Sequence, residues 1–543
     1  MRIHSKHIPL LFCLVLLLSG CQHANPTSQD VFYYNESSGI ASLDPAFAKN
    51  QSIIWPVHQL YNTLVEVDDQ MHIQPSLAKT WTFSKDLCTI VFTLRSDVYF
   101  HADPAFANGQ GRKLNAADVV YSFNRIIDPK LASPGAWIFN NRIALANPFL
   151  ALNDSMFQLT LIRPFQPVIE MLSNPYCSIV PHEAVEKYGT DFRRHPVGTG
   201  PFQMLAWEEG QSLILHKNAH YFEKDSSGIR LPYLKGVHIL FYTSKATEFL
   251  AFQQHQLDFI NDLDVSFKDE MLTKTGKLKK QWESTISLDK VSYLNTEYLG
   301  ILMDPNNVQV KISPLRFKKI RQAINYGIDR KKMLLYLRNS IGTPANSGFV
   351  PAGLPSFDSS LVKGYVYNPS KSLQLLKEAG FSDTHPMPQV TLLTIPNYAS
   401  LGTYLVNELK QLGINVQIEV IQKSLLLEQT SKSLAMFFRG SWIADYPDAE
   451  NYLSVFYSKN PAPPNYTRYA NPRYDHLYEA SLREQNDNIR YNLYRQMDSM
   501  IIEEAPIVPL WYDRVIHLTH KNLQGFHSNS MNLLNLKTVK KTD

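Results

Sequence analysis

Two short segments have the residue types of a catalytic or cofactor-binding site. Residues 182–186 (HEAVE) begin like a zinc-protease helix, but Glu186 stands where the second metal-binding histidine would be. Residues 198–200 (GTG) lack the third glycine of a dinucleotide-binding loop, and Pro201 removes a backbone donor that would hold phosphate. We therefore predict a surface helix at the first segment and a tight turn at the second, with no metal and no cofactor.

The rest of the chain contains no recognisable motif of catalytic residues. It contains no Gly-x-Ser-x-Gly nucleophile elbow and no phosphate-binding loop with its lysine. The 17 histidines are scattered rather than paired at metal-ligand spacing, and a lone one such as His101 is more often a core or loop residue than a ligand. We predict that the protein has no catalytic residues and is not an enzyme.

The N-terminus has the order of a secretory signal. Arg2 and Lys6 precede an apolar run at residues 8–18, which is too short for a comfortable transmembrane helix. Residues 18–21 (LSGC) resemble the bacterial lipobox, in which a peptidase cuts before the cysteine and the thiol becomes lipidated. The alternative is an ordinary signal peptide with an incidental cysteine. We predict a signal peptide at residues 1–20 and a lipid on Cys21.

A lipid on Cys21 would anchor the mature protein outside the cytoplasm, on the periplasmic side of a bacterial membrane or at the cell surface. Residues 21–30 are polar and are expected to form a tether. Gln22, rather than aspartate, follows the cysteine and does not favour retention in an inner membrane. Cys88 and Cys177 remain for the folded part, where a disulfide and two free thiols are both possible.

Length and charge narrow the class of protein further. A chain of 543 residues exceeds what one hydrophobic core serves, roughly 250–300 residues, so two or three lobes are expected. The formal net charge is +4, and it falls to +2 when the signal leaves with its two basic residues. This near-neutral body argues against a nucleic-acid partner, which would require a strongly basic face.

Strand and helix patterns alternate along the chain. Residues 88–94 alternate apolar and polar side chains, as a half-buried strand does. Helices are predicted at residues 115–127 with Asn115 as N-cap, from Ser313 with Phe317 on the apolar face, and through residues 489–501. The mixture predicts an α/β protein of layered sheets and helices.

Several segments, far apart and in order, resemble a known family. They are residues 42–45 (SLDP), 77–81 (LAKTW), 92–95 (FTLR), 117–123 (ADVVYSF), 197–202 (VGTGPF), 321–330 (RQAINYGIDR) and 442–448 (WIADYPD). Together they are similar to the family 5 extracellular solute-binding proteins, the peptide-binding components of ABC importers, over essentially the whole chain from about residue 30. One departure is the longer loop at residues 102–114, whose role stays open.

The resemblance implies an α/β, two-lobed fold of the periplasmic-binding-protein type (class II, large cluster), with an extra subdomain and two hinge strands between the lobes. The hinge crossings are expected near residues 290–300 and 507–512. The implied boundaries are 31–60, 197–292 and 510–543 for the core of lobe I, 61–196 for the extra subdomain and 293–509 for lobe II.

The resemblance also implies the ligand-binding residues. Asp445 matches the carboxylate that many peptide-binding members present to the α-amino group of the ligand, which forms a charge-assisted hydrogen bond; the alternative is a structural aspartate. Main-chain pairing with the peptide is implied for Gly39, Ile40 and Ala41 on one side and for Gly440 and Ser441 on the other. Trp442 and Tyr446 are expected either to line the cleft or to lie in the core.

The function that the resemblance implies is capture of di- or oligopeptides between the lobes and delivery to an ABC transporter permease with its ATPase subunits. We expect a monomer that touches the membrane through its N-terminal lipid. Receptors of the same fold for a nickel complex, haem or an oligosaccharide are the nearest alternatives. An exported peptide hydrolase and a sensing or chaperone-like role without transport are more distant ones.

Overall fold

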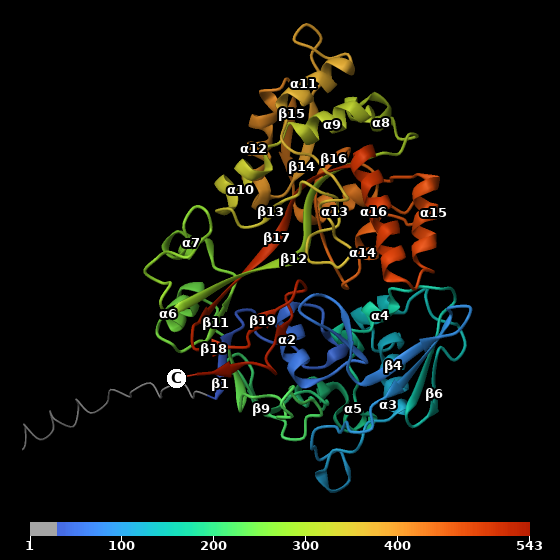
Figure 1. Ribbon diagram of the computed structural model, residues 1–543, viewed down its shortest axis with the longest axis vertical. Helices are drawn as coiled ribbons and strands as arrows, with labels where there is room; N and C mark the ends of the chain where they lie inside the picture. Colours follow the sequence, from blue (N-terminus) through green and yellow to red (C-terminus); the bar gives the residue numbers. More distant parts are fainter. Residues whose placement is uncertain (1–29, 543) are drawn as a thin grey trace, which may run out of the picture.

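The protein is an α/β molecule of two lobes, shown as a computed structural model in Figure 1. The structure describes residues 30–542, so the predicted signal peptide, Cys21 and most of the tether lie outside the described residues. Within that range, no helix is long and apolar enough to cross a membrane. The predicted fold class is confirmed: helices flank a large mixed sheet that extends through both lobes (Figure 1).

One eleven-stranded sheet connects the lobes. Its strands lie in the order β15 (Val416–Val420), β14 (Val390–Thr394), β16 (Phe437–Ile443), β12 (Ile286–Ile301), β17 (Ile507–His520), β11 (Phe259–Asn261), β1 (Val31–Asn35), β10 (Gly236–Leu240), β9 (Ser212–Lys217) and β8 (Phe202–Glu208), and β13 (Thr343–Pro344) pairs with β17. The first three strands belong to the upper lobe of Figure 1 and the last five to the lower lobe.

The two longest strands, β12 and β17, run antiparallel from one lobe into the other (Figure 1). Their pairing is interrupted between Ser292 and Thr296, so residues 293–295 form a bulge in β12. A bulge bends the strand and redirects its side chains. These are the two hinge strands of the predicted fold, and the bulge lies where they pass between the lobes.

The lower lobe also contains a separate four-stranded sheet, in the order β4 (Ala78–Phe83), β5 (Thr89–Leu94), β7 (Met156–Thr160) and β6 (Phe149–Asn153). Short two-stranded sheets join β2 (Val65–Val67) to β3 (Ile73–Pro75), β18 (Leu523–Gln524) to β21 (Lys540–Lys541) and β19 (His527–Ser528) to β20 (Leu534–Asn535). The helices of this lobe are α2 (Gln51–Leu60), α3 (Ala116–Ile127), α4 (Val168–Met171), α5 (His182–Tyr188), α6 (Lys245–Gln253) and α7 (Val265–Met271).

Among residues 30–542, nine helices belong to the upper lobe. They are α8 (Val308–Ile312), α9 (Lys318–Tyr326), α10 (Arg330–Arg338), α11 (Pro369–Glu378), α12 (Ala399–Lys410), α13 (Lys423–Ser431), α14 (Glu450–Leu453), α15 (Pro472–Ser481) and α16 (Asp487–Glu504). Figure 1 shows α15 and α16 side by side at the edge of this lobe that faces α4 of the lower lobe.

Two of the predicted elements are confirmed. Strand β5 buries alternate residues, as its pattern predicted. Helix α3 begins after Asn115, whose side chain accepts the backbone N–H of Ala117, while Asp118 accepts the N–H of Asn115 in return. This reciprocal capping box satisfies backbone donors that a helix otherwise leaves unpaired.

One helix prediction is wrong, and another differs in its buried face. The helix predicted from Ser313 is broken: residues 314–316 form a short 3₁₀ turn, Phe317 is extended and 41% exposed, and α9 begins only at Lys318. An extended residue cannot continue the helical hydrogen-bond ladder, so Phe317 does not join the apolar face. The helix predicted through residues 489–501 is present as α16, with Met497 and Ile501 on its buried face. That face also includes Arg490 and Tyr494, whereas Ile489 is 52% exposed.

The motif-like segments at residues 182–186 and 198–200 have structural roles. The first is the start of α5, as predicted, and its Glu183 forms an ion pair with Arg112 of the 102–114 loop. In the second, a Cβ atom at Gly198 would lie 2.1 Å from the carbonyl oxygen of Leu60. Glycine is required because the two backbones pack in direct contact. Cys88 and Cys177 are both free thiols.

Two buried arginines fasten the helices of the upper lobe to hinge strand β17. Arg330 is 2% exposed, and its guanidinium donates to the carbonyl of Pro509 (2.6 Å) and to the carbonyl of Asn325 (3.0 Å). Arg321 donates to the carbonyls of Glu504 (2.7 Å) and Ala505 (3.0 Å), next to the start of β17. A charged donor satisfies several buried carbonyls at once, and its loss would leave them unpaired.

We expect Arg330→Met to destabilise the protein by about 3 kcal/mol, because buried carbonyls would lose their donors. In calorimetric melting this should lower the midpoint by about 3 °C. Lys331→Met is the matched control, since Lys331 is exposed on the same helix. Equal melting of the two variants would contradict this role for Arg330.

Candidate ligand-binding cleft

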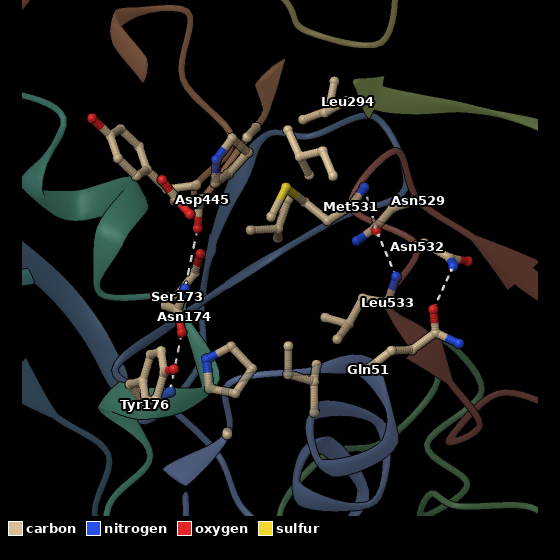
Figure 2. Close-up of a pocket in the computed structure, with 18 of the residues that line it drawn as sticks. Gln51, Ser173, Asn174, Tyr176, Leu294, Asp445, Asn529, Met531, Asn532 and Leu533 are labelled. Carbon is tan, nitrogen blue, oxygen red and sulfur yellow. Dashed lines mark hydrogen bonds between the residues drawn. The ribbon is translucent and has the colours of Figure 1, made fainter. Parts of the chain in front are cut away.

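A cavity of about 320 Å³ lies where the lobes meet. Its walls come from distant parts of the chain: residues 48–55 at the start of α2, Trp137, residues 173–176, Tyr293 and Leu294 of the β12 bulge, residues 443–447 after β16, and residues 529–533. Figure 2 shows Asp445 and Asn174 on one side of this cavity and Gln51, Asn529 and Asn532 on the opposite side. The volume is at the lower end of what small-molecule sites in proteins have, roughly 300–1,000 Å³.

The bulge in β12 holds the two walls together. The backbone N–H of Leu294 donates to the carbonyl of Ser530 (2.9 Å), and its carbonyl accepts the N–H of Ala444 (2.9 Å). Ser530 lies beside Asn529 in the lower lobe, and Ala444 precedes Asp445 in the upper lobe. One residue of the hinge strand therefore fixes the position of both walls.

Asp445 presents a carboxylate to the cavity. Its side chain is exposed to the cleft, yet protein surrounds it closely enough for burial to raise the pKa of the carboxyl group. A hydrogen bond from Asn451 opposes this increase in pKa, because its side-chain N–H₂ lies 3.5 Å from the carboxylate of Asp445. Within residues 30–542, no cation forms an ion pair with Asp445. An uncompensated carboxylate of this kind favours a cationic group on a ligand.

Asn451 positions two of the predicted binding residues. Its side-chain oxygen accepts the indole N–H of Trp442 (2.9 Å) and lies 3.4 Å from the backbone nitrogen of Asp445. Trp442 packs against the main core and does not line the cavity. Tyr446 does line it, stacking at 6.1 Å on Trp137 of the other lobe and donating its hydroxyl to Glu450.

Gly440 and Ser441 lie within β16 behind the Asp445 wall. Both pair with β12, opposite Tyr298 and Glu297. A Cβ atom at Gly440 would lie 2.6 Å from the ring of Tyr298, so only glycine fits there. On the other side of β16, the described ladder to β14 contains the single pair Leu393 and Phe438. The strand edge beyond Phe438 therefore lacks a strand partner.

Gly39, Ile40 and Ala41 lie apart from the cavity, in the loop that follows β1. Ile40 is 9% exposed and belongs to the main hydrophobic core, and the carbonyl of Ala41 accepts a hydrogen bond from Arg193 (3.4 Å). None of the three lines the cavity that contains Asp445. The preceding residues, Ser37 and Ser38, line an adjoining cavity of about 310 Å³ that shares Asn50, Gln51 and Trp55 with the first.

Several residues of the cleft were not predicted from the sequence. They are Lys49, Gln51, Trp137, Asn174, Asn529 and Asn532. A partial signal exists for the first two, which closely follow the segment at residues 42–45, and for the asparagines at 529 and 532, which form a polar run near the C-terminus. Nothing in the local pattern indicates that Asn174 donates to the backbone carbonyl of Asp445 (3.1 Å) from the other lobe.

A buried ion cluster joins the lobes close to the cleft. The side chain of Arg490 in α16 is 2% exposed and lies near three carboxylates: Asp487 (3.1 Å), Glu170 of α4 (3.3 Å) and Asp448 (3.5 Å). Burial, and secondly the charge of Asp448, raise the pKa of Glu170, although Arg490 acts in the opposite direction. The carboxylates outnumber the cation, so Glu170 retains its proton to a higher pH than an ordinary glutamate does.

The groups on the cavity walls are suited to binding a polar ligand. In the part of the chain that the structure describes, no group of three or more histidine, cysteine or acidic residues is arranged to hold a metal ion. The walls instead offer one carboxylate, one ammonium group, side-chain amides and aromatic rings. Such groups hold a polar ligand by hydrogen bonds and apolar contact.

Comparisons with known proteins agree on one family. Residues 72–464 match the family model of the bacterial extracellular solute-binding proteins, family 5 Middle. The chain is 24% identical over 545 residues to the dipeptide-binding protein DppE of Bacillus subtilis, covering 95% of this chain and 93% of DppE. It is 27% identical over 501 residues to the glutathione-binding protein GsiB of Salmonella typhi, covering 90% of each.

Solved structures show the same fold. The structure of HbpA2 from Haemophilus parasuis matches with a TM-score of 0.82 at 21% identity, covering 94% of this chain and 100% of that one. These family members and relatives are solute-binding proteins of transport systems rather than enzymes, and the family is extracellular.

Glu170→Gln should change stability in a pH-dependent way. The unfolded chain ionises Glu170 near the ordinary glutamate pKa, whereas the folded protein keeps it protonated to a higher pH, so rising pH destabilises the native protein relative to the glutamine variant. We expect similar melting midpoints near about pH 5 and an advantage of about 3 °C or more for the variant near about pH 8.

Glu186→Gln, at an exposed glutamate, is the control and should melt like the native protein at both pH values. An advantage of the Glu170→Gln variant that did not grow with pH would contradict the raised pKa.

Proposed function

We propose, because this chain belongs to the bacterial extracellular solute-binding proteins of family 5, that it captures di- or oligopeptides between its lobes and delivers them to an ABC transporter permease. The observation that carries this proposal is the uncompensated carboxylate of Asp445 at the wall of the interlobe cavity. The relatives DppE and GsiB, whose names state a dipeptide and glutathione as ligands, support a peptide-like solute.

In this proposal Asp445 receives the α-amino group of the peptide. Every linear peptide with a free N-terminus offers an ammonium group there, so this contact requires no particular side chain. The aromatic neighbours are proposed to line the space for ligand side chains, with Tyr446 at the wall and Trp442 supporting it through Asn451.

The peptide backbone is proposed to pair with protein main chain. The edge of β16 at Gly440 and Ser441 supports this role, because it lacks a strand partner beyond Phe438. Gly39, Ile40 and Ala41 are proposed as the facing segment. They lie outside the cavity in this structure, so closure of the lobes would have to bring them to the ligand, as hinge closure does in binding proteins of this kind.

In the cell, the protein is proposed to act as a monomer that does no chemistry, while ATPase subunits of the transporter supply the energy. Lobe I comprises residues 31–60, 197–292 and 510–543, with an extra subdomain at residues 61–196, and lobe II comprises residues 293–509. The protein stands outside the cytoplasm, tethered to a bacterial membrane by a lipid on Cys21.

Asp445→Asn should weaken binding of peptides that have a free amine by about 10–100-fold, because a charge-assisted hydrogen bond of about 1.5–3 kcal/mol is lost. N-acetylated forms of the same peptides should bind equally to both proteins in titration calorimetry. Asp383→Asn, at an exposed aspartate, is the control. An equal loss for free and acetylated peptides would refute the role of Asp445, and stabilisation by another solute but by no peptide would refute the proposed ligand class.

The lipid anchor has its own test. Mass spectrometry of the mature N-terminus from bacterial membranes should find a chain that begins at Cys21 and carries a lipid mass. A mature chain that begins elsewhere, or that has an unmodified Cys21, would contradict the anchor without affecting the ligand assignment.

A further inference from the structure

The side of the cavity opposite Asp445 offers hydrogen-bond donors that have no acceptor. We call it the donor wall: Lys49, Gln51, Asn529 and the amino end of α2 (Figure 2 shows Gln51 and Asn529). Asn529 is 5% exposed, and within residues 30–542 its amide nitrogen has no hydrogen-bond partner. An amide N–H₂ that lines a cavity and has no protein acceptor is available to donate to an acceptor on a ligand.

The orientation of these amides is fixed by their neighbours. The side-chain oxygen of Asn529 accepts the backbone N–H groups of Met531 (3.1 Å) and Leu533 (3.2 Å), so its nitrogen must occupy the other position. Similarly, the oxygen of Gln51 lies 3.2 Å from the amide nitrogen of Asn532. The nitrogen of Gln51 is left without a partner in the part of the chain that the structure describes.

His517 of hinge strand β17 orients the side-chain amide of Asn532. The Nε2 atom of His517 lies 3.0 Å from the side-chain oxygen of Asn532 and 3.1 Å from that of Asn261. Two acceptor oxygens around one ring nitrogen require that this nitrogen carries a proton. The chain of bonds from His517 through Asn532 to Gln51 therefore presents only donors to the cavity.

Two further features add positive potential to the same wall. Lys49 lines the cavity and is exposed to it, and its ammonium group has no ion-pair partner among the described residues. Helix α2 begins at the cavity, and Asn50, which precedes it, makes no side-chain capping hydrogen bond to its backbone. An uncapped helix start with its partial positive charge favours an anion.

We propose that the donor wall binds a carboxylate of the ligand, so that one short peptide spans the cavity with its amine at Asp445 and its carboxylate at Lys49, Gln51 and Asn529. Asp445 and Lys49 are the only charged residues of the described chain that line this cavity, one of each sign. The matching ligand is a zwitterion small enough for both ends to lie in about 320 Å³. This inference rests on the proposed function and assigns the peptide length class that it left open.

The test is titration calorimetry with di-, tri- and tetrapeptides of apolar residues, each as the free acid and as the C-terminal amide. The native protein should bind the shorter free acids at least about 10-fold more tightly than their amides, because a charged acceptor is lost in the amide. Lys49→Met and Gln51→Glu should each remove most of this difference between free acids and amides. Lys85→Met, at an exposed lysine of the same lobe, should behave like the native protein.

An amide peptide with glutamate as its second residue identifies the source of the carboxylate. Recovery of tight binding would assign the donor wall to an acidic side chain, whereas weak binding assigns it to the C-terminus. Equal affinity for acids and amides in the native protein would overturn the inference while leaving peptide binding intact. If no peptide of either form binds, the proposed function itself fails.

Discussion

The cleft depends on the three-residue interruption in the pairing of β12 with β17. At this bulge the backbone of Leu294 cannot bond to β17 and instead bonds to Ser530 of one lobe and Ala444 of the other. Unpaired backbone groups in a protein interior are costly, so these two bonds are strongly favoured. Because Asn529 and Asp445 are the immediate neighbours of those two residues, the bulge sets both the distance between the walls and the groups that face each other across it.

The charged groups of the cleft have fewer partners among the described residues than several buried ions of the molecule have. Lys537, for example, lies between Glu66 (3.0 Å) and Glu223 (2.7 Å), and Arg330 donates to several carbonyls. In the cleft, Asp445 lacks a cation and the donor wall lacks acceptors, within the residues that the structure describes. Unpaired groups of this kind lower the stability of the empty protein, and a ligand with complementary ends relieves that cost.

Much of the fold follows from local patterns in the sequence. Asn115 predicted the start of α3 because a capping side chain acts on the next few residues only, and the alternation around Phe92 predicted β5. The predictions failed where distant contacts decide the outcome. Phe317 looks like part of an apolar helix face, but the chain is extended there. No local pattern indicates that Arg490 is buried beside Glu170 of α4 and Asp448.

The candidate site was predictable only in part, for the same reason. Asp445 was found through a resemblance, and the structure places it at a cavity wall, while its assignment to a ligand amine stays a proposal. The donor wall could not be predicted, because it joins residue 51 to residues 529–532 through bonds that no local pattern encodes. The ligand class can be identified by mass spectrometry of the solutes that the purified protein retains after incubation with a complex mixture of peptides and other small molecules. We expect enrichment of short peptides with free amino and carboxyl ends, whereas retention of a non-peptide solute, with no peptide retained, would rule out peptide capture.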